Sequence, residues 1–185
     1  MTAFFHSPVT ATAIEAVFDA VFFSTHQTVL RGGAAEPFYQ PATADAPHCI
    51  HYREDFVSSS LHEVAHWLVA GEARRLLPDW GYWYAPDGRD AQQQVAFEQV
   101  EVRPQAIEWW LHHACGLPFR VSLDNLGSAA GDGRVFRDAV FAEAIRLQSE
   151  GLNARAVRFH AALAAQFGGE ADIQRVVLQR EVLDA

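Results

Sequence analysis

The segment His62-Glu63-Val64-Ala65-His66 constrains this chain more than any other, because it reads H-E-x-x-H. Residues four apart on an α-helix share one face, so the two imidazoles can converge on one metal ion if this stretch is helical. Chance would give about 0.03 such matches in a chain of this composition. The segment therefore predicts a helix that carries two metal ligands, with a third ligand supplied by another element.

Glu63 lies between the two histidines in sequence but not on their face of the helix. One step along an α-helix is a turn of roughly 100°, so its carboxylate points away from the direction of His62. In zinc peptidases with this motif the glutamate activates the bound water. We therefore expect Glu63 to be a catalytic base or proton carrier beside the metal, and not a ligand.

An acidic stripe further along the chain is the expected source of the third ligand. Glu98, Glu101, Gln105 and Glu108 follow one another at steps of three, four and three residues. This spacing places them on one helical face. Like charges on one face repel unless a cation or arginines neutralise them, although a solvated acidic face is the simpler interpretation. We expect Glu101 to be the ligand, with Glu98 as the alternative.

Two histidines and one carboxylate leave coordination positions open, and these ligand types do not select the metal. With Fe(II) such a site binds O₂ and substrate, whereas with Zn²⁺ it activates water for hydrolysis. Three functions are therefore open: an iron-dependent hydroxylase, a zinc peptidase or hydrolase with Glu63 as general base, and a metal-stabilised docking module without catalysis. The H-E-x-x-H motif alone favours the hydrolase.

An aromatic loop after the metal-motif helix is a candidate substrate site. Tyr82, Trp83 and Tyr84 precede a Pro-Asp-Gly turn that contains Asp87. Structural packing is the simplest explanation for such rings, but aromatic faces also attract cations. With the acidic residues nearby, the loop would suit a long aliphatic chain that ends in an amine. We take these four residues as candidate substrate-binding residues.

The rest of the pattern predicts a mainly helical α+β fold with a minor β component, in one compact domain that spans residues 1–185. Ser58, Ser59 and Ser60 offer N-cap hydroxyls for the metal-motif helix. A short extended piece is expected at 38–39, and an edge strand at 49–52. The expected helices cover residues 10–30, 58–77, 91–115 with a kink or division at Pro104, 135–149, 154–167 and 171–182.

Charge and composition restrict the partners. The formal net charge of −9 disfavours nonspecific binding of nucleic acid, which needs a basic surface. The two cysteines lie far apart in sequence, which suits a reducing compartment. No stretch reaches the about 18 consecutive apolar residues of a membrane-spanning helix, and the N-terminus does not resemble a secretory signal. We expect a cytoplasmic protein with neither a nucleic-acid nor a membrane partner.

Longer motifs around the metal-motif helix resemble those of a known family. H-E-V-A-H-W at 62–67 is followed by A-G-E-A-R-R at 70–75, G-Y-W-Y-A-P-D-G-R-D at 81–90, F-E-Q-V-E-V-R-P-Q-A at 97–106 and S-L-D-N-L at 122–126. In this order the motifs closely resemble the elongation factor P hydroxylase family of bacteria. The resemblance extends from residue 36 to residue 126.

The resemblance implies an activity and a site. Members of this family hydroxylate the modified lysine of translation elongation factor P, usually after a β-lysyl group has been attached. They use a non-haem metal held by two histidines and one carboxylate. His62 and His66 match the family histidines, and Glu98 and Glu101 both match acidic positions of its F-E-x-V-E-V motif. The resemblance thus implies an oxidoreductase that uses Fe(II), with zinc as the alternative metal, molecular oxygen as co-substrate and elongation factor P as partner.

Overall fold

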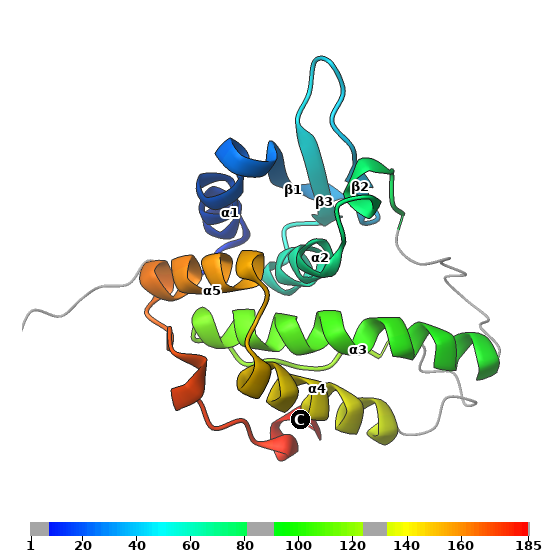
Figure 1. The fold of residues 1–185 in the computed structure, drawn as a ribbon, viewed down its shortest axis with the longest axis vertical. Coiled ribbons are helices and arrows are strands. Elements are labelled where there is room, and N and C mark those ends of the chain that lie inside the picture. Colours follow the sequence, from blue (N-terminus) through cyan, green and yellow to red (C-terminus); the bar gives the residue numbers. More distant parts are fainter. Residues whose placement is uncertain (1–7, 81–90, 124–132, 185) are drawn as a thin grey trace, which may run out of the picture.

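The computed structural model describes residues 8–80, 91–123 and 133–184. Within these ranges the chain is mainly helical with one small sheet, so the expected fold class, α+β with a minor β component, is confirmed (Figure 1). The α-helices are α1 (Ala11–His26), α2 (Val57–Val69), α3 (Ala91–Ala114), α4 (Arg134–Glu150) and α5 (Ala154–Phe167). The strands are β1 (Thr28–Ala34), β2 (Phe38–Gln40) and β3 (His48–Arg53).

The sheet has the order β1-β3-β2. β1 runs parallel to β3 with Leu30 opposite Ile50, and β2 runs antiparallel to β3 with Tyr39 opposite Ile50. The expected short extended piece at 38–39 is confirmed as β2. The expectation of an edge strand at 49–52 is wrong, because β3 is the central strand. Ile50 and Tyr52 are both buried, and a strand with partners on both sides can bury such residues.

The first predicted helix ends earlier than expected. Gln27 has a left-handed conformation (φ 48°), and its N–H bonds to the carbonyl of Phe23, which ends α1 at His26. The following residues pair with β3 instead, because a short apolar run fits a buried strand as well as a helix. Gly32 is part of this strand. A Cβ at Gly32 would lie 2.6 Å from the Tyr52 hydroxyl.

α2, which carries the H-E-x-x-H motif, is shorter than the predicted helix. Its N-cap residue is Phe56, with no side-chain cap, so the expected serine cap is wrong. Ser60 is buried inside the helix, and its hydroxyl donates to the Val57 carbonyl at 2.7 Å. The helix stops at Val69 because Ala70 has an extended ψ of 128°, and a short 3₁₀ helix, Arg74–Leu76, follows.

Two further expectations differ from the structure. α3 runs without a break through Pro104, although proline removes one helical hydrogen bond. α3 packs against α2, α4 and α5 along its length. The helix expected at 171–182 is absent, and residues in this range form parts of two short 3₁₀ helices, Ile173–Arg175 and Arg180–Asp184.

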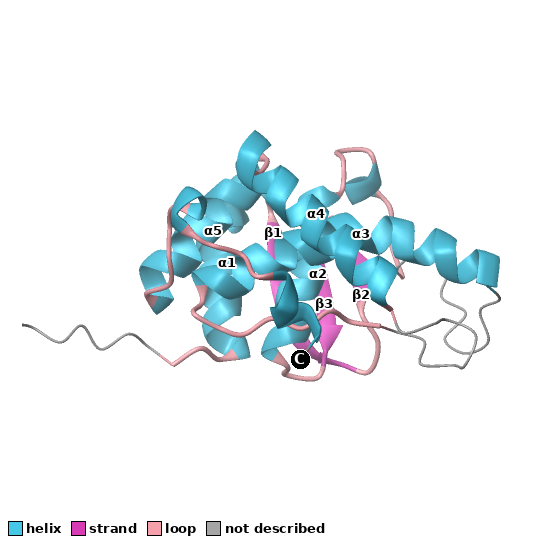
Figure 2. Ribbon diagram, turned by 90° about the horizontal axis from the view of Figure 1, so that it is seen from below, coloured by secondary structure: helices cyan, strands magenta, loops and turns pink. Residues whose placement is uncertain are grey.

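α1 and α2 pack against the small sheet, and α2 lies between the sheet and α3 (Figure 1). Figure 2 shows how few of the residues belong to strands. An aromatic cluster joins three helices: the rings of Phe18 and Phe22 on α1, Trp67 on α2 and Phe159 on α5 lie 4.8–5.9 Å apart in contacting pairs. Trp67 is in the last turns of α2, so this cluster fixes the end of the helix that carries the histidines. Among the described residues, no helix is both long and apolar enough to cross a bilayer.

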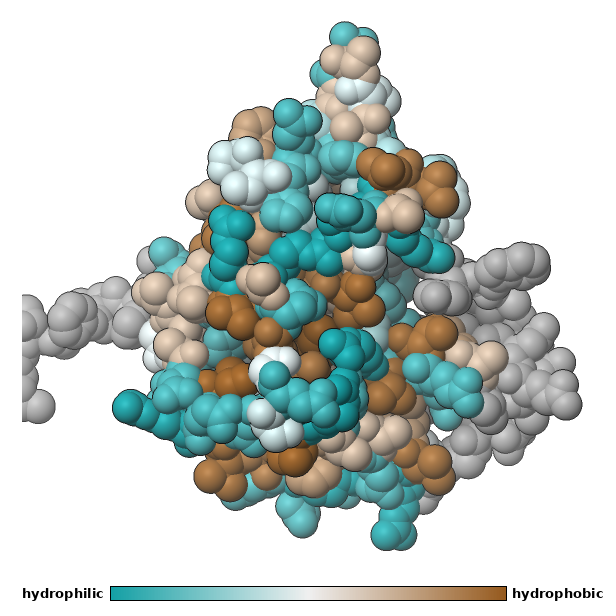
Figure 3. All heavy atoms as spheres, in the orientation of Figure 1, coloured by the Kyte–Doolittle hydropathy of each residue, from teal (hydrophilic) through white to brown (hydrophobic). Residues whose placement is uncertain are grey.

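The surface shown in Figure 3 mixes polar and apolar side chains. Three large apolar side chains after α2 are exposed: Leu76 (68%), Leu77 (61%) and Trp80 (68%). The Trp80 ring stacks on Phe38 of β2 with centroids 3.9 Å apart. This exposed apolar group directly precedes residues 81–90 in the chain.

Candidate metal centre

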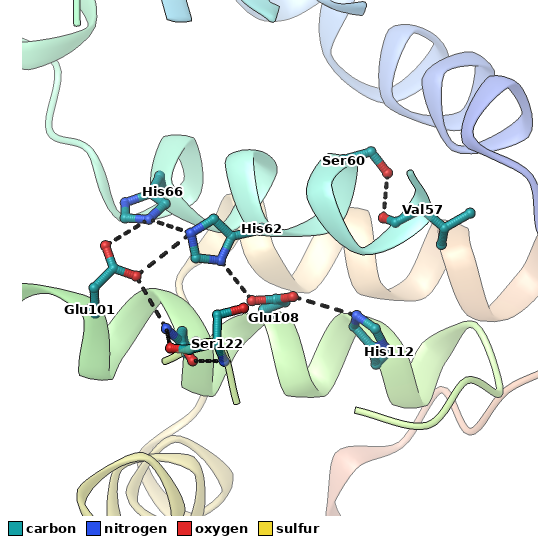
Figure 4. Close-up of polar contacts among 9 residues, drawn as sticks. Val57, Ser60, His62, His66, Glu101, Glu108, His112 and Ser122 are labelled. Atoms are coloured by element: carbon teal, nitrogen blue, oxygen red, sulfur yellow. Dashed lines mark hydrogen bonds and ion pairs between the residues drawn. The ribbon is translucent and has the colours of Figure 1, made fainter. Parts of the chain in front are cut away.

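Side chains from α2 and α3 meet at one point (Figure 4). His62 and His66 lie one turn apart on α2, and Glu101 faces them from α3. One potential ligand atom from each residue lies within 4.8 Å of the others. Across the described ranges this is the one group of three or more histidine, cysteine or acidic side chains with such an arrangement. Glu98, the alternative ligand, is not part of it.

The distances between the donor atoms fit a shared metal ion. The Nε2 atoms of His62 and His66 are 3.1 Å apart, and Glu101 Oε1 is 3.1 Å from His66 Nε2. Glu101 Oε2 is 3.6 Å from His62 Nε2. Two ligands bound at about 2.1 Å to one ion, with an angle between 90° and 109°, are about 3.0–3.4 Å apart. The donor set therefore needs little rearrangement to hold a metal.

The site is anchored on the α3 side and accessible on the α2 side. Glu101 is only 4% exposed, whereas the His62 and His66 side chains are 22% and 30% exposed. A buried carboxylate requires a partner of opposite charge or several hydrogen bonds. Solvent-accessible imidazoles leave room for a further molecule to approach. The arrangement thus combines a fixed acidic ligand with an open face.

Glu108 holds the second nitrogen of His62. Its Oε2 lies 2.8 Å from His62 Nδ1 (Figure 4), and the residue is 3% exposed. Because a carboxylate accepts, His62 donates its Nδ1 proton, and its Nε2 atom faces Glu101 and His66. Metal-binding histidines commonly have a carboxylate or carbonyl in this position. The structure thus leaves Nε2, and not Nδ1, as the nitrogen of His62 that can bind a metal.

Gln105 contacts Glu101, as Glu108 contacts His62. Its Nε2 is 3.4 Å from Glu101 Oε2 and donates to the Ser122 carbonyl at 3.1 Å. The Ser122 N–H donates to Gln105 Oε1 at 3.0 Å. One buried amide therefore links the carboxylate of the site to the backbone of the segment that follows α3.

The electrostatics of the site favour positive charge among the three donors. Burial alone would raise the pKa of Glu101, but the charge and hydrogen bond of His66, with the charge of His62, bring it down to about 2. Burial would lower the pKa of His62, yet Glu108 and then Glu101 raise it to about 10. The pKa of Glu108 is lowered despite burial, because His62 attracts its charge. The same acidic surroundings would favour a bound cation.

Glu63 lies outside the donor group, as expected from its direction on the helix. Burial raises the pKa of its carboxyl, although the charges of His62 and His66 oppose this shift. A carboxyl of raised pKa keeps its proton at a higher pH than a free glutamate does. The four candidate substrate-binding residues lie outside the described residues: Tyr82, Trp83, Tyr84 and Asp87.

Sequence reasoning missed the contacts that surround the donors. Glu108 belongs to the acidic stripe, but its contacts with His62 and His112 were not expected. In the structure the buried His112 lies beside Glu108, with Nε2 3.5 Å from Glu108 Oε1. The sequence spacing could have predicted the contacts along α3, because Glu101 and Gln105, like Glu108 and His112, are four residues apart on one helix.

A family model described as elongation factor P hydroxylase matches residues 17–176 of this chain. The chain belongs to the elongation factor P hydroxylase family. A relative from Haemophilus influenzae, named elongation factor P lysine hydroxylase, is 45% identical over 161 residues, which cover 86% of this chain and 90% of that protein. The family resemblance drawn from the motifs is therefore confirmed. Neither match bears the name of a peptidase, so nothing here supports the hydrolase alternative for this hydroxylase family member.

Proposed function

We propose that this chain hydroxylates a lysine side chain of translation elongation factor P, after β-lysylation, with a metal ion held by His62, His66 and Glu101. The observation that carries the proposal is the convergence of these three donors in a chain of the hydroxylase family. The name of the Haemophilus influenzae relative supports the lysine of elongation factor P as the substrate. A translation factor as substrate implies a cytoplasmic enzyme.

The chemistry explains why side chains alone are not enough. An aliphatic C–H bond of lysine is not acidic near pH 7, so acid–base catalysis cannot break it. One atom of O₂ enters this bond and the other leaves as water, which consumes two electrons and two protons from an external reductant. When bound, a redox-active metal such as Fe(II) supplies the oxidising power that the side chains lack. We therefore propose iron rather than zinc.

The residues of the site have separate roles in this proposal. His62, His66 and Glu101 would occupy one side of the metal and leave the other side for oxygen and substrate. Glu63, whose pKa is raised by burial, would hold or transfer a proton beside the metal. The acceptor position of Glu108 would keep the Nε2 atom of His62 available.

Substrate recognition in the proposal involves residues 81–90. Tyr82, Trp83 and Tyr84 would contact the aliphatic part of the modified lysine, and Asp87 would pair with an amine. The exposed Trp80, which stacks on Phe38, directly precedes these residues in the chain. The net charge of −9 would attract a basic partner.

The test is the intact mass of β-lysylated elongation factor P after incubation with this protein, Fe(II), a reductant and air. We expect a gain of one oxygen, which His62→Ala and His66→Ala abolish while the circular dichroism spectrum stays unchanged. Glu150→Gln, which removes an exposed charge on α4, is the matched control and should retain the gain. Equal product from wild type and His62→Ala would overturn the proposed site. No product from fully metallated wild type would overturn the activity.

A further inference from the structure

A buried chain of polar groups extends from His62 into the protein. Glu108 Oε2 is 2.8 Å from His62 Nδ1, and Glu108 Oε1 is 3.5 Å from His112 Nε2. His112 Nδ1 lies 2.7 Å from the Pro118 carbonyl oxygen. Glu108 is 3% exposed and His112 is 6% exposed. These groups are therefore largely shielded from water, and their interactions with one another determine their orientations.

The hydrogen-bonding capacity of each group fixes the direction of this chain. The Pro118 carbonyl only accepts, so His112 Nδ1 carries a proton and donates it. The other ring nitrogen of His112 then faces one oxygen of Glu108 at ion-pair distance. The second oxygen of Glu108 accepts from His62 Nδ1. Glu108 Oε2 thus accepts a hydrogen bond from His62, whereas Oε1 only lies at ion-pair distance from His112 Nε2, which has no hydrogen-bond partner among the described residues.

We propose that Glu108 and His112 are positioning residues for His62. Glu108 holds the Nδ1 proton and the ring plane of His62, so that its Nε2 atom faces the metal, and His112 with the Pro118 carbonyl holds Glu108. A carboxylate on the outer nitrogen also makes the imidazole a stronger metal ligand. The inference rests on the metal centre of the proposed function and assigns a role to two residues outside its donor group.

A parallel arrangement on the same helix supports a positioning role. Glu101 has Gln105 four residues later, and Gln105 bonds to the Ser122 backbone. Glu108 has His112 four residues later, and His112 bonds to the Pro118 carbonyl. Both acidic side chains that contact the two histidines of α2 are thus tied, through a partner one turn along α3, to the segment 117–123. This segment braces the α3 side of the site.

The test uses Co(II) binding, followed by visible absorption, in wild type, Glu108→Gln and His112→Gln. Gln keeps the shape of Glu108 but loses its charge. We expect the Co(II) Kd to rise about 10–100-fold in Glu108→Gln and roughly tenfold in His112→Gln, because outer-shell partners of metal histidines have effects of this size. Glu150→Gln removes an exposed charge on α4 and should bind as wild type does.

Histidine ¹H–¹⁵N spectra of the Zn(II)-loaded proteins give a readout that a purely structural role would not change. In wild type, we expect a protected, downfield Nδ1 proton on His62. In Glu108→Gln this proton should shift upfield and exchange faster, while His66 in the same spectrum keeps its signals. An unchanged His62 proton with an unchanged Co(II) Kd in Glu108→Gln would overturn the positioning role.

Co(II) binding by the wild-type protein distinguishes failure of the positioning role from failure of the proposed function. If wild type binds Co(II), and His62→Ala abolishes that binding, the metal centre stands, and an unaffected Glu108→Gln variant overturns the positioning role alone. If wild type binds no Co(II), or if His62→Ala binds it equally well, the metal centre itself is overturned, and the role of Glu108 and His112 falls with it.

Discussion

Asn153 ties the N-terminus of α5 to the end of the helix that carries the metal-binding histidines. Its Oδ1 accepts from the backbone N–H groups of Arg155 and Ala156 at 3.1 and 3.0 Å, which caps α5. Its Nδ2 donates to the Leu68 carbonyl at 3.0 Å, in the last turn of α2. Asn153→Ala removes all three hydrogen bonds at once, so we expect it to destabilise the protein measurably.

The contacts of Asn153 give the size of the effect. Loss of an N-cap side chain costs about 1 kcal/mol. Loss of the bond to Leu68 costs about 1 kcal/mol more, and not the larger cost of an unsatisfied buried group, because Arg155 Nη2 also donates to this carbonyl at 3.0 Å. The expected total is roughly 2 kcal/mol, which lowers the Tm of a domain of this size by roughly 4–8 °C.

Urea unfolding of three proteins tests this reasoning: wild type, Asn153→Ala and Asn153→Asp. Aspartate keeps the oxygen that accepts both cap hydrogen bonds but cannot donate to Leu68, so it should lose about half of the stability that alanine loses. The m-value should not change, because both variants unfold the same structure. A decrease in the free energy of unfolding of less than about 0.5 kcal/mol in Asn153→Ala, or equal decreases in both variants, would refute the reasoning. The cap and the hydrogen bond to Leu68 would then not make the separate contributions assigned to them.

Three other expectations follow from the structure. Glu101→Gln should reduce Co(II) affinity more than 100-fold, whereas Glu98→Gln should change it less than tenfold, and equilibrium titration distinguishes them. Burial raises the pKa of Cys49 to about 11 and that of Cys115 to about 12. Alkylation by iodoacetamide at pH 8 should therefore be more than about 100-fold slower in native than in urea-unfolded protein, since the thiolate reacts. Keeping these thiols neutral should contribute its full share to the free energy of unfolding below about pH 8.5, the pKa of an unfolded thiol. This contribution should be lost as the pH rises toward the native pKa values, which urea unfolding between about pH 8 and 10 would detect. Gly169→Ala should destabilise by about 1–3 kcal/mol, because a Cβ there would lie 2.3 Å from two backbone oxygens at the end of α3; an unchanged thermal midpoint would contradict this.

The helices were predictable where capping residues agree with the apolar spacing. Asn153 caps α5 and Gly168 ends it in a left-handed conformation, and the predicted range 154–167 is the observed one. The sheet was only partly predictable. Val29 and Leu30 continue the apolar pattern of α1 but belong to β1, and only the pairing with β3 decides between helix and strand. That pairing connects residues about 20 positions apart, which local spacing does not report.

In the site, the sequence predicted the group of donors but not the surroundings that orient them. His62 and His66 follow from their spacing on one helix. Glu101 and Glu98 are three residues apart on the same stripe, so spacing alone does not separate them. The rotation of α3 against α2 decides which of them meets the histidines, and that rotation depends on packing by buried residues such as Ile107 and Trp110.

The central claim is that this protein inserts one oxygen atom from O₂ into a lysine side chain of elongation factor P. Isotope labelling of that oxygen atom tests it most directly. β-Lysylated elongation factor P is incubated with the protein, Fe(II) and reductant under ¹⁸O₂ in ordinary water, and the peptide with the modified lysine is analysed by mass spectrometry. We predict that this lysine gains one heavy oxygen with wild type and none with Glu101→Gln. A peptide without added oxygen, or one that gains only the light isotope from water, would contradict the hydroxylase account.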